Sequence, residues 1–349
     1  MTATVIVTRQ LPADVEAAVL ALASDDLKVL YHKSDDPLDR ATLLEWCSSS
    51  AVVGIYCLLT DRIDAEVLEA CGDGLRVVST MSVGYNHIDV EWCKAHGVAV
   101  GYTPDVLTET TADLAVALLL ATARRIPEAA NAVKAGEWTT WKPMWLTGKD
   151  VFGSTVGIVG LGRIGAAIAR RLRGFGCAIR YTGASGPKPD LAGPVEAEFR
   201  DMDALLSESD FVVVACALVP ATRGLIGAAQ LRAMKSDAVL VNISRGEVVD
   251  QDALIEALRA GDIGAAGLDV TTPEPLPASS PLLSMPNVVV LPHIGSASVR
   301  TRELIAKMAA QNLQAGVQGA AALPFPVPGT AAPPAADGAA VAAAAGGSA

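Results

Sequence analysis

The chain has 349 residues, of which 51% are hydrophobic, which is enough apolar side chain for the cores of two domains. Its formal net charge of −11 argues against a nucleic acid or an anionic membrane as a partner, because both require a basic surface. The longest apolar run, residues 114–123, is far shorter than the roughly 20 residues of a membrane span. The six cysteines form no Cys-x-x-Cys pair and no N-terminal signal is visible, so we expect reduced thiols and a cytoplasmic protein.

Short apolar runs alternate with amphipathic stretches in the first hundred residues. The runs are 5–8, 27–31, 52–58, 76–80 and 98–102, and the amphipathic stretches include 12–23, 40–47 and 65–71. Apolar strands that alternate with helices indicate a parallel sheet covered on both faces. The sequence therefore predicts a flavodoxin-like domain of five strands.

A long apolar helix is predicted over residues 107–125, and a segment of weak periodicity follows it up to residue 153. This segment contains Trp138, Trp141 and Trp145, three of the five tryptophans of the chain. The segment is either a loop packed on its own domain or an arm that wraps a second subunit, since aromatic residues are enriched in interface cores.

Residues 155–173 predict a short buried strand, a glycine turn and a helix. The glycines Gly160, Gly162 and Gly165 give the pattern G-x-G-x-x-G. The first glycine permits the tight turn, the second lets a pyrophosphate approach the backbone, and the third lets the helix lie close to the strand. The N–H groups at the helix start would hold the phosphates, which favours a dinucleotide site.

The same alternation continues to residue 318. Strands are predicted at 156–159, 178–182, 211–217, 239–243, 265–270 and 288–291, and helices at 202–207, 228–234, 251–260 and 298–318. Six such strands predict a doubly wound Rossmann cofactor domain inserted into the flavodoxin-like domain. We expect a substrate-binding domain of residues 1–103 plus 298–328 and a cofactor domain of 104–297, with a dimerisation arm around 124–150. Residues 329–349 are Ala-rich with almost no large apolar side chains, which predicts a disordered tail.

Four polar clusters follow predicted strands, where ligands of open α/β sheets bind. They are 82–84, 244–246, 269–274 and 293–296. Arg245 offers a planar fork that can grip a carboxylate at two points, and His293 can transfer a proton near neutral pH. Glu274 could orient His293 and stabilise its charged form. No Cys/His spacing typical of a metal site appears.

Several motifs resemble those of the D-2-hydroxyacid dehydrogenases. They are GLGRIG at 160–165, NISRGEVVDQDALIEAL at 242–258, GLDVTTPEPLP at 267–277 and LPHIGSAS at 291–298. Within that family, STMSVGYNHID at 79–89, GYTPDVLTETTADLAVALLL at 101–120 and WTTWKPMWL at 138–146 resemble the glyoxylate/hydroxypyruvate reductases. The resemblance runs from about Thr4 to Gly319.

The resemblance implies a homodimeric enzyme with its active site between the two domains, and it favours the dimerisation arm over the packed loop. It implies that Arg245 binds the substrate carboxylate and polarises the carbonyl, that His293 protonates the oxygen, and that Glu274 hydrogen-bonds His293. The implied substrate-binding residues are Val83, Gly84, Arg245, Asp269, His293, Ser296 and Trp141, the last from the arm. The implied cofactor-binding residues are Gly160, Gly162, Arg163, Ile164, Gly165, Thr182, Gly183, Ala184, Ser185, Lys188, Ala217, Ile243 and Gly295.

The choice of cofactor can be argued from the end of the second strand of the cofactor domain. An NAD enzyme places an acid there to bond the ribose 2′-OH, but residues 181–185 contain none. Thr182 and Ser185 could bond a 2′-phosphate, with Lys188 as its counter-charge. Ala184 stands where reductases of this family often carry an Arg. We therefore expect NADPH to be preferred, less strongly than with that Arg, and NADH to be possible.

The leading hypothesis is reduction of glyoxylate to glycolate and of hydroxypyruvate to D-glycerate. Two alternatives stay open within the enzymes, another 2-ketoacid reductase and a D-3-phosphoglycerate dehydrogenase, although extra basic residues for a substrate phosphate are not apparent. A different class of function is a cofactor-sensing module, because the resemblance extends to corepressors.

Overall fold

The computed structural model describes residues 2–330, which form two compact units. Unit 1 contains residues up to Leu107 and from Ser298 onward, and unit 2 is Thr108–Ala297. The sequence-based boundary at 103/104 lies four residues before this division, which falls at the start of helix α5. Among residues 2–330, no helix is both long and apolar enough to cross a membrane.

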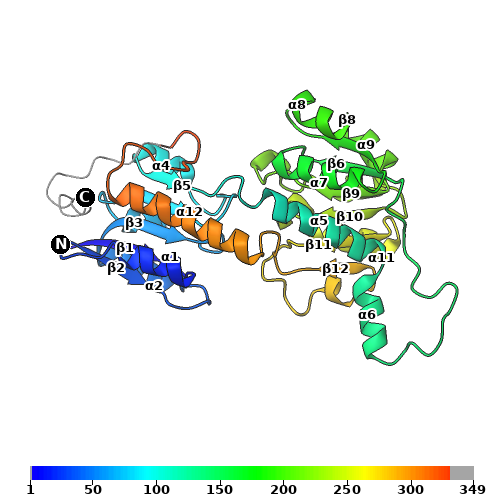
Figure 1. Ribbon diagram of the computed structural model, residues 1–349, viewed down its shortest axis with the longest axis horizontal. Coiled ribbons are helices and arrows are strands. Elements are labelled where there is room, and N and C mark those ends of the chain that lie inside the picture. Colours follow the sequence, from blue (N-terminus) through cyan, green and yellow to red (C-terminus); the bar gives the residue numbers. More distant parts are fainter. Residues whose placement is uncertain (1, 331–349) are drawn as a thin grey trace, which may run out of the picture. The chain divides into compact units, whose positions relative to one another are not determined.

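Unit 1 is built on a parallel sheet of five strands in the order β2-β1-β3-β4-β5, as the flavodoxin-like prediction requires. Its strands are β1 (Ala3–Val7), β2 (Leu27–Tyr31), β3 (Ala51–Cys57), β4 (Val77–Thr80) and β5 (Ala99–Gly101). Its helices are α1 (Ala13–Leu20), α2 (Arg40–Ser48), α3 (Ala65–Ala70), α4 (Val90–Ala95) and α12 (Val299–Val317) (Figure 1). Helix α4 was not predicted.

Alternate residues of the central strands of unit 1 pack on opposite faces of the sheet. Val5 and Val7 of β1 lie in the core with α1 and α12, whereas Ile6 lies in the core with α2 and α3. Asp39, Asp64 and Asp89 cap helices α2, α3 and α4 by accepting a backbone N–H of the first turn. Both faces of this sheet are therefore covered by helices, and an Asp marks the start of three of them, α2, α3 and α4.

The last described residues run along strand β5. The N–H of Val327 donates to the carbonyl of Val100 at 2.7 Å, and the hydroxyl of Thr330 accepts from the N–H of Val100 at 3.4 Å. Gly329 and Thr330, which the sequence places in the disordered tail, are thus described next to β5. The rest of the predicted tail, residues 331–349, lies outside the described residues.

Unit 2 is built on a parallel sheet of seven strands in the order β12-β11-β10-β9-β6-β7-β8. Its strands are β6 (Thr155–Val159), β7 (Ala178–Thr182), β8 (Glu198–Phe199), β9 (Phe211–Val214), β10 (Val239–Asn242), β11 (Ala265–Leu268) and β12 (Val288–Val290). Its α-helices are α5 (Thr108–Ala123), α6 (Ile126–Lys134), α7 (Arg163–Arg173), α8 (Pro189–Ala192), α9 (Met202–Glu208), α10 (Ala228–Ala233) and α11 (Gln251–Ala260). Four short 3₁₀ turns are described as well, η1 (Gly193–Val195), η2 (Pro220–Thr222), η3 (Gly246–Val248) and η4 (Pro281–Ser284).

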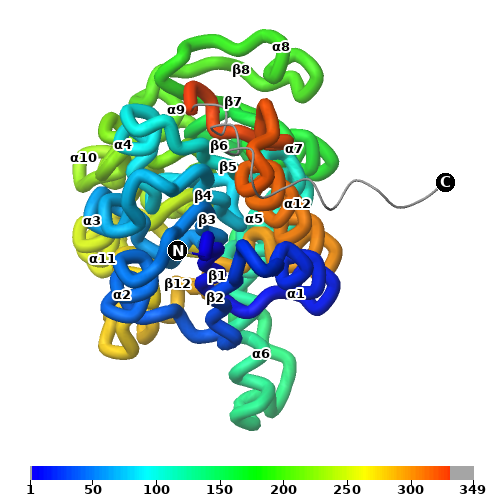
Figure 2. Tube along the Cα trace, turned by 90° about the vertical axis from the view of Figure 1, so that its left-hand side faces the viewer, coloured from blue at the N-terminus to red at the C-terminus, as the bar shows by residue number. Residues whose placement is uncertain are grey.

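Two features of unit 2 correct the sequence prediction. The sheet has a seventh strand, because Glu198–Phe199 pairs with β7 at the edge, and two residues are too short a run to show a pattern. The segment of weak periodicity begins with a true helix, α6, which Figure 2 and Figure 1 both show standing away from the sheet of its unit. Most of its residues are not buried, so the apolar periodicity that indicates a packed helix in a sequence is weak there.

Candidate active site

Three neighbouring strands of unit 2 bring the predicted catalytic residues to one edge of the sheet. Strands β10, β11 and β12 lie side by side and run parallel. Arg245 follows β10, Asp269 follows β11, and His293 follows β12. Because carboxyl ends of parallel strands share an edge, residues nearly fifty positions apart in sequence become neighbours there.

His293 and Glu274 form a direct pair. Nδ1 of His293 lies 2.9 Å from Oε2 of Glu274, and Oε1 of Glu274 accepts the N–H of Thr271 at 2.9 Å. Burial raises the pKa of Glu274, but the hydrogen bond and charge of His293, the Thr271 N–H and the charge of Arg245 outweigh it, so the pKa is lowered. Glu274 is thus held as an acceptor, which leaves Nε2 of His293 as the nitrogen available to a substrate.

The backbone around His293 is fixed by Asp269. His293 adopts a left-handed conformation with φ of 56°, and its N–H donates to the carbonyl of Asp269 at 2.9 Å. The Asp269 carboxylate then accepts the N–H groups of Ile294 and Gly295, each at 2.8 Å. Burial raises the pKa of Asp269, while these two N–H groups and the charge of His293 oppose that rise.

Arg245 stands at the end of β10 on a turn that a buried amide holds in place. The Asn242 side chain donates to the carbonyl of Arg245 at 2.9 Å and accepts from the N–H of Ser244 at 3.0 Å. Burial lowers the pKa of Arg245, and the negative charges of Glu274 and Glu247 work against that decrease. A half-buried cation thus lies within the field of the Glu274 carboxylate.

The glycine turn has the geometry that its sequence pattern predicts. Gly160 has φ of +102°, and a Cβ there would lie 2.7 Å from the backbone of Cys216. A Cβ on Gly165 would overlap the carbonyl oxygen of Gly160, so the helix can lie this close only without a side chain. A Cβ on Gly162 would meet no heavy atom within 4 Å. Its small size is therefore not needed for packing within the chain.

The start of helix α7 fits a dinucleotide phosphate. Gly162 is the N-cap of α7 and has no side chain that could accept a first-turn N–H. Open space over Gly162 and the N–H groups at the start of α7 together make a cradle for an anion. The residues present thus fit the pyrophosphate of a nicotinamide dinucleotide.

Lys188 reaches the same turn from the loop after β7. Its Nζ donates to the carbonyl of Leu161 at 3.2 Å, and its N–H donates to the hydroxyl of Tyr181 at 2.8 Å. Thr182 is buried, and its carbonyl accepts the N–H of Gly160 at 2.9 Å. Gly183 is half-buried, whereas Ala184 and Ser185 are exposed. The cation predicted to face a 2′-phosphate therefore touches the glycine turn itself.

The other predicted cofactor and substrate residues of unit 2 lie on the loops that follow its strands. Ile243 is buried after β10, Ala217 is exposed after β9, and Ser296 is half-buried after β12. Trp141 is elsewhere, in the segment after α6, with 79% of its surface exposed. Within the described chain it is therefore not packed on its own unit.

Val83 and Gly84 belong to unit 1, on the loop after β4. The hydroxyl of Ser82 donates to the carbonyl of Gly84 at 2.7 Å and lies 2.8 Å from that of Thr80. Nε2 of His87 lies 3.0 Å from the Thr80 hydroxyl. A small hydroxyl network thus shapes the loop that carries the two predicted N–H donors.

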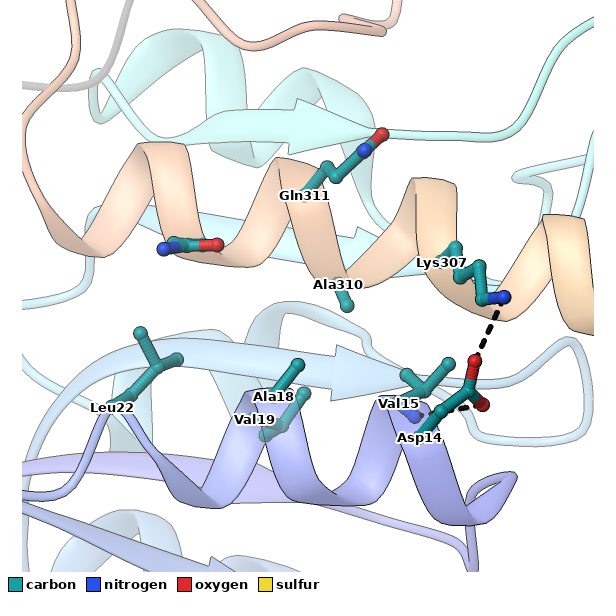
Figure 3. A pocket seen from close by; sticks show the side chains of 9 residues that line it. Asp14, Val15, Ala18, Val19, Leu22, Lys307, Ala310 and Gln311 are labelled. Carbon is teal, nitrogen blue, oxygen red and sulfur yellow. Dashed lines mark hydrogen bonds and ion pairs between the residues drawn. The ribbon is translucent and has the colours of Figure 1, made fainter.

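Unit 1 also carries a groove between α1 and α12, of about 290 Å³, with Val15, Val19 and Ala310 along it (Figure 3). An ion pair between Asp14 and Lys307, 2.7 Å apart, closes one end. None of the predicted site residues lines this groove. In residues 2–330, no cluster of three or more His, Cys, Asp or Glu residues could hold a metal ion.

Two residues that support the site were missed or undervalued by sequence reasoning. Asn242 received no role, although an amide that ends a buried strand must find partners and is a signal for a built turn. Asp269 is predicted as a substrate-binding residue, but the sequence does not show that its carboxylate also accepts the backbone N–H groups of Ile294 and Gly295. The sequence shows that both positions are polar, but it does not show which backbone groups their side chains bind.

Comparisons with known proteins show the family to which the chain belongs. Residues 116–295 match the model of the D-isomer specific 2-hydroxyacid dehydrogenase NAD-binding domain. The chain is 52% identical to the human glyoxylate reductase/hydroxypyruvate reductase over 90% of this chain and 95% of that one. A glyoxylate reductase of Korarchaeum cryptofilum is 46% identical over 90% of this chain and 93% of that one.

One solved structure is informative about ligands. It is the NADPH-dependent glyoxylate/hydroxypyruvate reductase of Sinorhizobium meliloti in complex with NADP and malonate, 33% identical with a TM-score of 0.80 over 96% of this chain and all of that one. The family model covers half of the chain, and the human relative covers most of it. The chain therefore belongs to the D-isomer specific 2-hydroxyacid dehydrogenases, a family of NAD(P)-dependent oxidoreductases.

Proposed function

We propose that the protein reduces glyoxylate to glycolate and hydroxypyruvate to D-glycerate, with NADPH preferred over NADH. The observation that carries the proposal is the pair of His293 and Glu274, 2.9 Å apart at the sheet edge that also carries Arg245. The names of the relatives point to the same two substrates for those proteins.

The residues of the chain divide the work of a ketoacid reduction. Reduced nicotinamide supplies the hydride that adds to C2 of the substrate. Arg245 binds the substrate carboxylate with its planar fork and polarises the neighbouring carbonyl. His293 donates the proton that the carbonyl oxygen requires as it becomes a hydroxyl, and Glu274 stabilises the charged imidazole beforehand. The backbone N–H groups of Val83 and Gly84 are proposed as further donors to the carboxylate.

The preference for NADPH rests on the loop after β7. The loop holds no acid between Tyr181 and Ser185 that would repel a 2′-phosphate, and Lys188 lies against the glycine turn. Because Ala184 cannot supply the guanidinium that an Arg would, the preference is proposed to be modest. A ratio of kcat/KM that strongly favours NADH would overturn this part of the proposal.

A homodimer is proposed from the segment after α6. Trp138, Trp141 and Met144 are 63%, 79% and 77% exposed in the single chain. Exposed apolar side chains that lie together are typical of a protein–protein interface. We propose that residues 124–150 pack on a second copy and that Trp141 contributes to the substrate site of that copy. Sedimentation of the wild type should show a dimer, and Trp141→Ala should weaken it or change substrate preference. A Trp141→Ala protein unchanged in both would contradict the proposal.

A kinetic panel tests the reaction. Purified protein is mixed with NADPH and, in turn, glyoxylate, hydroxypyruvate, pyruvate and 3-phosphohydroxypyruvate, and the loss of NADPH absorbance is followed. The first two substrates should have the highest kcat/KM. A maximum with 3-phosphohydroxypyruvate would instead favour a D-3-phosphoglycerate dehydrogenase, and cofactor binding without turnover of any ketoacid would favour a sensing module.

Two variants assign the roles. His293→Ala should lower kcat by about 10² to 10⁴-fold while leaving the Kd for NADPH unchanged, because the proton donor is lost and the phosphate cradle is not. Arg245→Ala should mainly raise KM for the ketoacid. The binding free energy should weaken by several kcal/mol, because the buried substrate carboxylate loses its cation. His32 lies in unit 1, with its Nε2 3.0 Å from the carbonyl oxygen of Asp36, and His32→Ala serves as the control variant.

A further inference from the structure

Gln251 makes a two-point contact with the loop that carries Glu274. Its Nε2 donates to the carbonyl of Thr272 at 2.6 Å, and its Oε1 accepts the N–H of Thr272 at 2.9 Å. Both bonds join the side chain to the backbone of one residue, 21 positions away in sequence. A side-chain amide thereby pairs with Thr272 much as a neighbouring strand would.

The residue before Thr272 in the same loop holds Glu274 through its backbone N–H group. Thr271 donates its N–H to Oε1 of Glu274 at 2.9 Å, and its hydroxyl donates to the carbonyl of Pro273 at 2.9 Å. Oε2 of Glu274 then lies 2.9 Å from Nδ1 of His293. A continuous series of bonded groups therefore leads from Gln251 through Thr272 and Thr271 to the catalytic pair.

Gln251 is itself fixed at the start of a helix. It is the first residue of α11, whose N-cap Asp250 accepts the N–H of Ala253 at 3.1 Å and donates its own N–H to Ile226 at 3.0 Å. On the other side of the loop, a Cβ on Gly246 would overlap the carbonyl of Thr271. The Glu274 loop is thus held between α11 and the Arg245 turn.

We propose that Gln251 is a positioning residue that holds the Thr271–Thr272 backbone so that Glu274 meets His293. The role rests on the proposed function, because it concerns the pair that would transfer the proton. Thr272 and Pro273 are exposed, so surface packing does little to hold this loop. The two hydrogen bonds of the Gln251 side-chain amide are therefore the contacts that restrain the loop from the side of α11.

Gln251→Met tests the proposal because methionine keeps the length of the side chain and loses both bonds. We expect kcat/KM to fall on the order of tenfold, with little change in the Kd for NADPH, since small misplacements at a catalytic pair are costly. Glu256→Gln, a polar change at an exposed position of the same helix, is the matched control and should leave kcat/KM unchanged. Thermal unfolding of all three proteins checks that they are folded.

The pH profile separates positioning from a merely structural role. The N–H of Thr271 and the charge of His293 lower the pKa of Glu274, so loosening the loop should raise that pKa. We then expect the acid side of the kcat/KM profile to move to higher pH in Gln251→Met. Arg245, Glu247 and Asp269, the other charged groups around the pair, are the same in both proteins.

Amide hydrogen exchange gives a readout that does not depend on turnover. Gln251→Met removes the acceptor of the Thr272 N–H directly, and the proposal further requires faster exchange at the Thr271 N–H, which Glu274 holds. The Ala253 N–H, held by the Asp250 cap, should not change. Faster exchange at Thr272 alone, with the Thr271 N–H and the pH profile as in the wild type, would refute the role of Gln251.

A double-mutant cycle identifies the residue through which Gln251 acts. In a Glu274→Gln background, Gln251→Met should cost much less than its tenfold effect in the wild type, because the group that it positions is already gone. Equal losses in both backgrounds would contradict the proposal. If wild-type protein turns over none of the four ketoacids, the proposed function fails, while the exchange experiment still decides the role of Gln251.

Discussion

The carboxylate of Asp269 holds the backbone N–H of Gly295 at 2.8 Å, across 26 residues of chain. Its other oxygen holds the N–H of Ile294 at the same distance. The side chain is buried, and burial alone would favour its neutral form. The loop after His293 is therefore fixed by an acceptor that faces two donors.

Replacing Asp269 by Asn should damage this loop even though the shape of the side chain is kept. An Asn offers one oxygen, and its NH₂ group would face one of the two N–H donors. We expect the free energy of unfolding to fall by about 1–3 kcal/mol, because a buried donor loses its acceptor. The catalytic kcat/KM should fall with it, since His293 lies directly before this backbone. Asp203→Asn, at an exposed position of α9, is the control, and urea unfolding with ketoacid kinetics is the measurement.

Stability should depend on pH through Glu274. Its pKa in the folded protein lies below the ordinary value of 4.5, although burial alone would raise it, because His293, the Thr271 N–H and Arg245 favour the charged form. A carboxyl with a lowered pKa stabilises the fold above its unfolded pKa, and that contribution is lost as pH falls through the folded pKa. The difference in unfolding free energy between wild type and Glu274→Gln should therefore be constant above about pH 5 and shrink below it. Urea unfolding at several pH values measures it, and a difference that grows on acidification would contradict the assignment.

The fold was largely predictable because buried parallel strands read as continuous apolar runs. The runs at 178–182 and 27–31 coincide with β7 and β2, and the helix at 251–260 coincides with α11. Strand β8 was missed because two residues carry no period, and α6 because few of its side chains are buried. Pattern and burial thus decide which elements can be predicted.

The residues of the candidate site could be predicted where the type of side chain indicates its chemistry. They could not be predicted where a role depends on contacts between distant parts of the chain. An imidazole, a carboxylate and a guanidinium after strands are few enough to single out His293, Glu274 and Arg245 from the chain. The contacts of Asp269 with the N–H groups after His293 depend on how β11 and β12 are paired, which no local pattern reveals. The same holds for the bonds between Gln251 and Thr272, 21 residues apart.

Two glycines of one turn should respond differently to alanine. At Gly165, a Cβ would overlap the carbonyl of Gly160 and lie 3.2 Å from Ile158, so Gly165→Ala should lower the unfolding free energy by about 1–3 kcal/mol. At Gly162, a Cβ would meet no protein atom within 4 Å, so Gly162→Ala should keep the stability of the wild type. Its NADPH affinity should nevertheless fall tenfold or more, roughly 1.4 kcal/mol, because the added methyl group occupies the phosphate cradle.

Calorimetric titration with NADPH, beside urea unfolding, tests the glycine pair. A Gly162→Ala protein that binds NADPH as tightly as the wild type would show that the phosphates do not lie over this turn. A Gly162→Ala protein with a lower free energy of unfolding would show that packing within the chain does require a glycine at this position. Only the first result would separate the turn from cofactor binding.

The charge of Lys188 should distinguish the two nicotinamide cofactors. Its Nζ lies 3.2 Å from the carbonyl of Leu161, next to the glycine turn, where the 2′-phosphate of NADPH and not the 2′-hydroxyl of NADH would use a cation. We expect Lys188→Ala to lower kcat/KM for NADPH by about tenfold and to leave kcat/KM for NADH nearly unchanged, because a hydrogen bond to a charged group is worth about 1.5–3 kcal/mol. Ala184→Arg, at an exposed position of the same loop, should move the ratio the other way by supplying a fork for the phosphate. Equal losses with both cofactors in Lys188→Ala would contradict a specific role of Lys188 at the 2′-phosphate, and the proposed preference for NADPH would then rest on Thr182, Ser185 and the N–H groups of their loop alone.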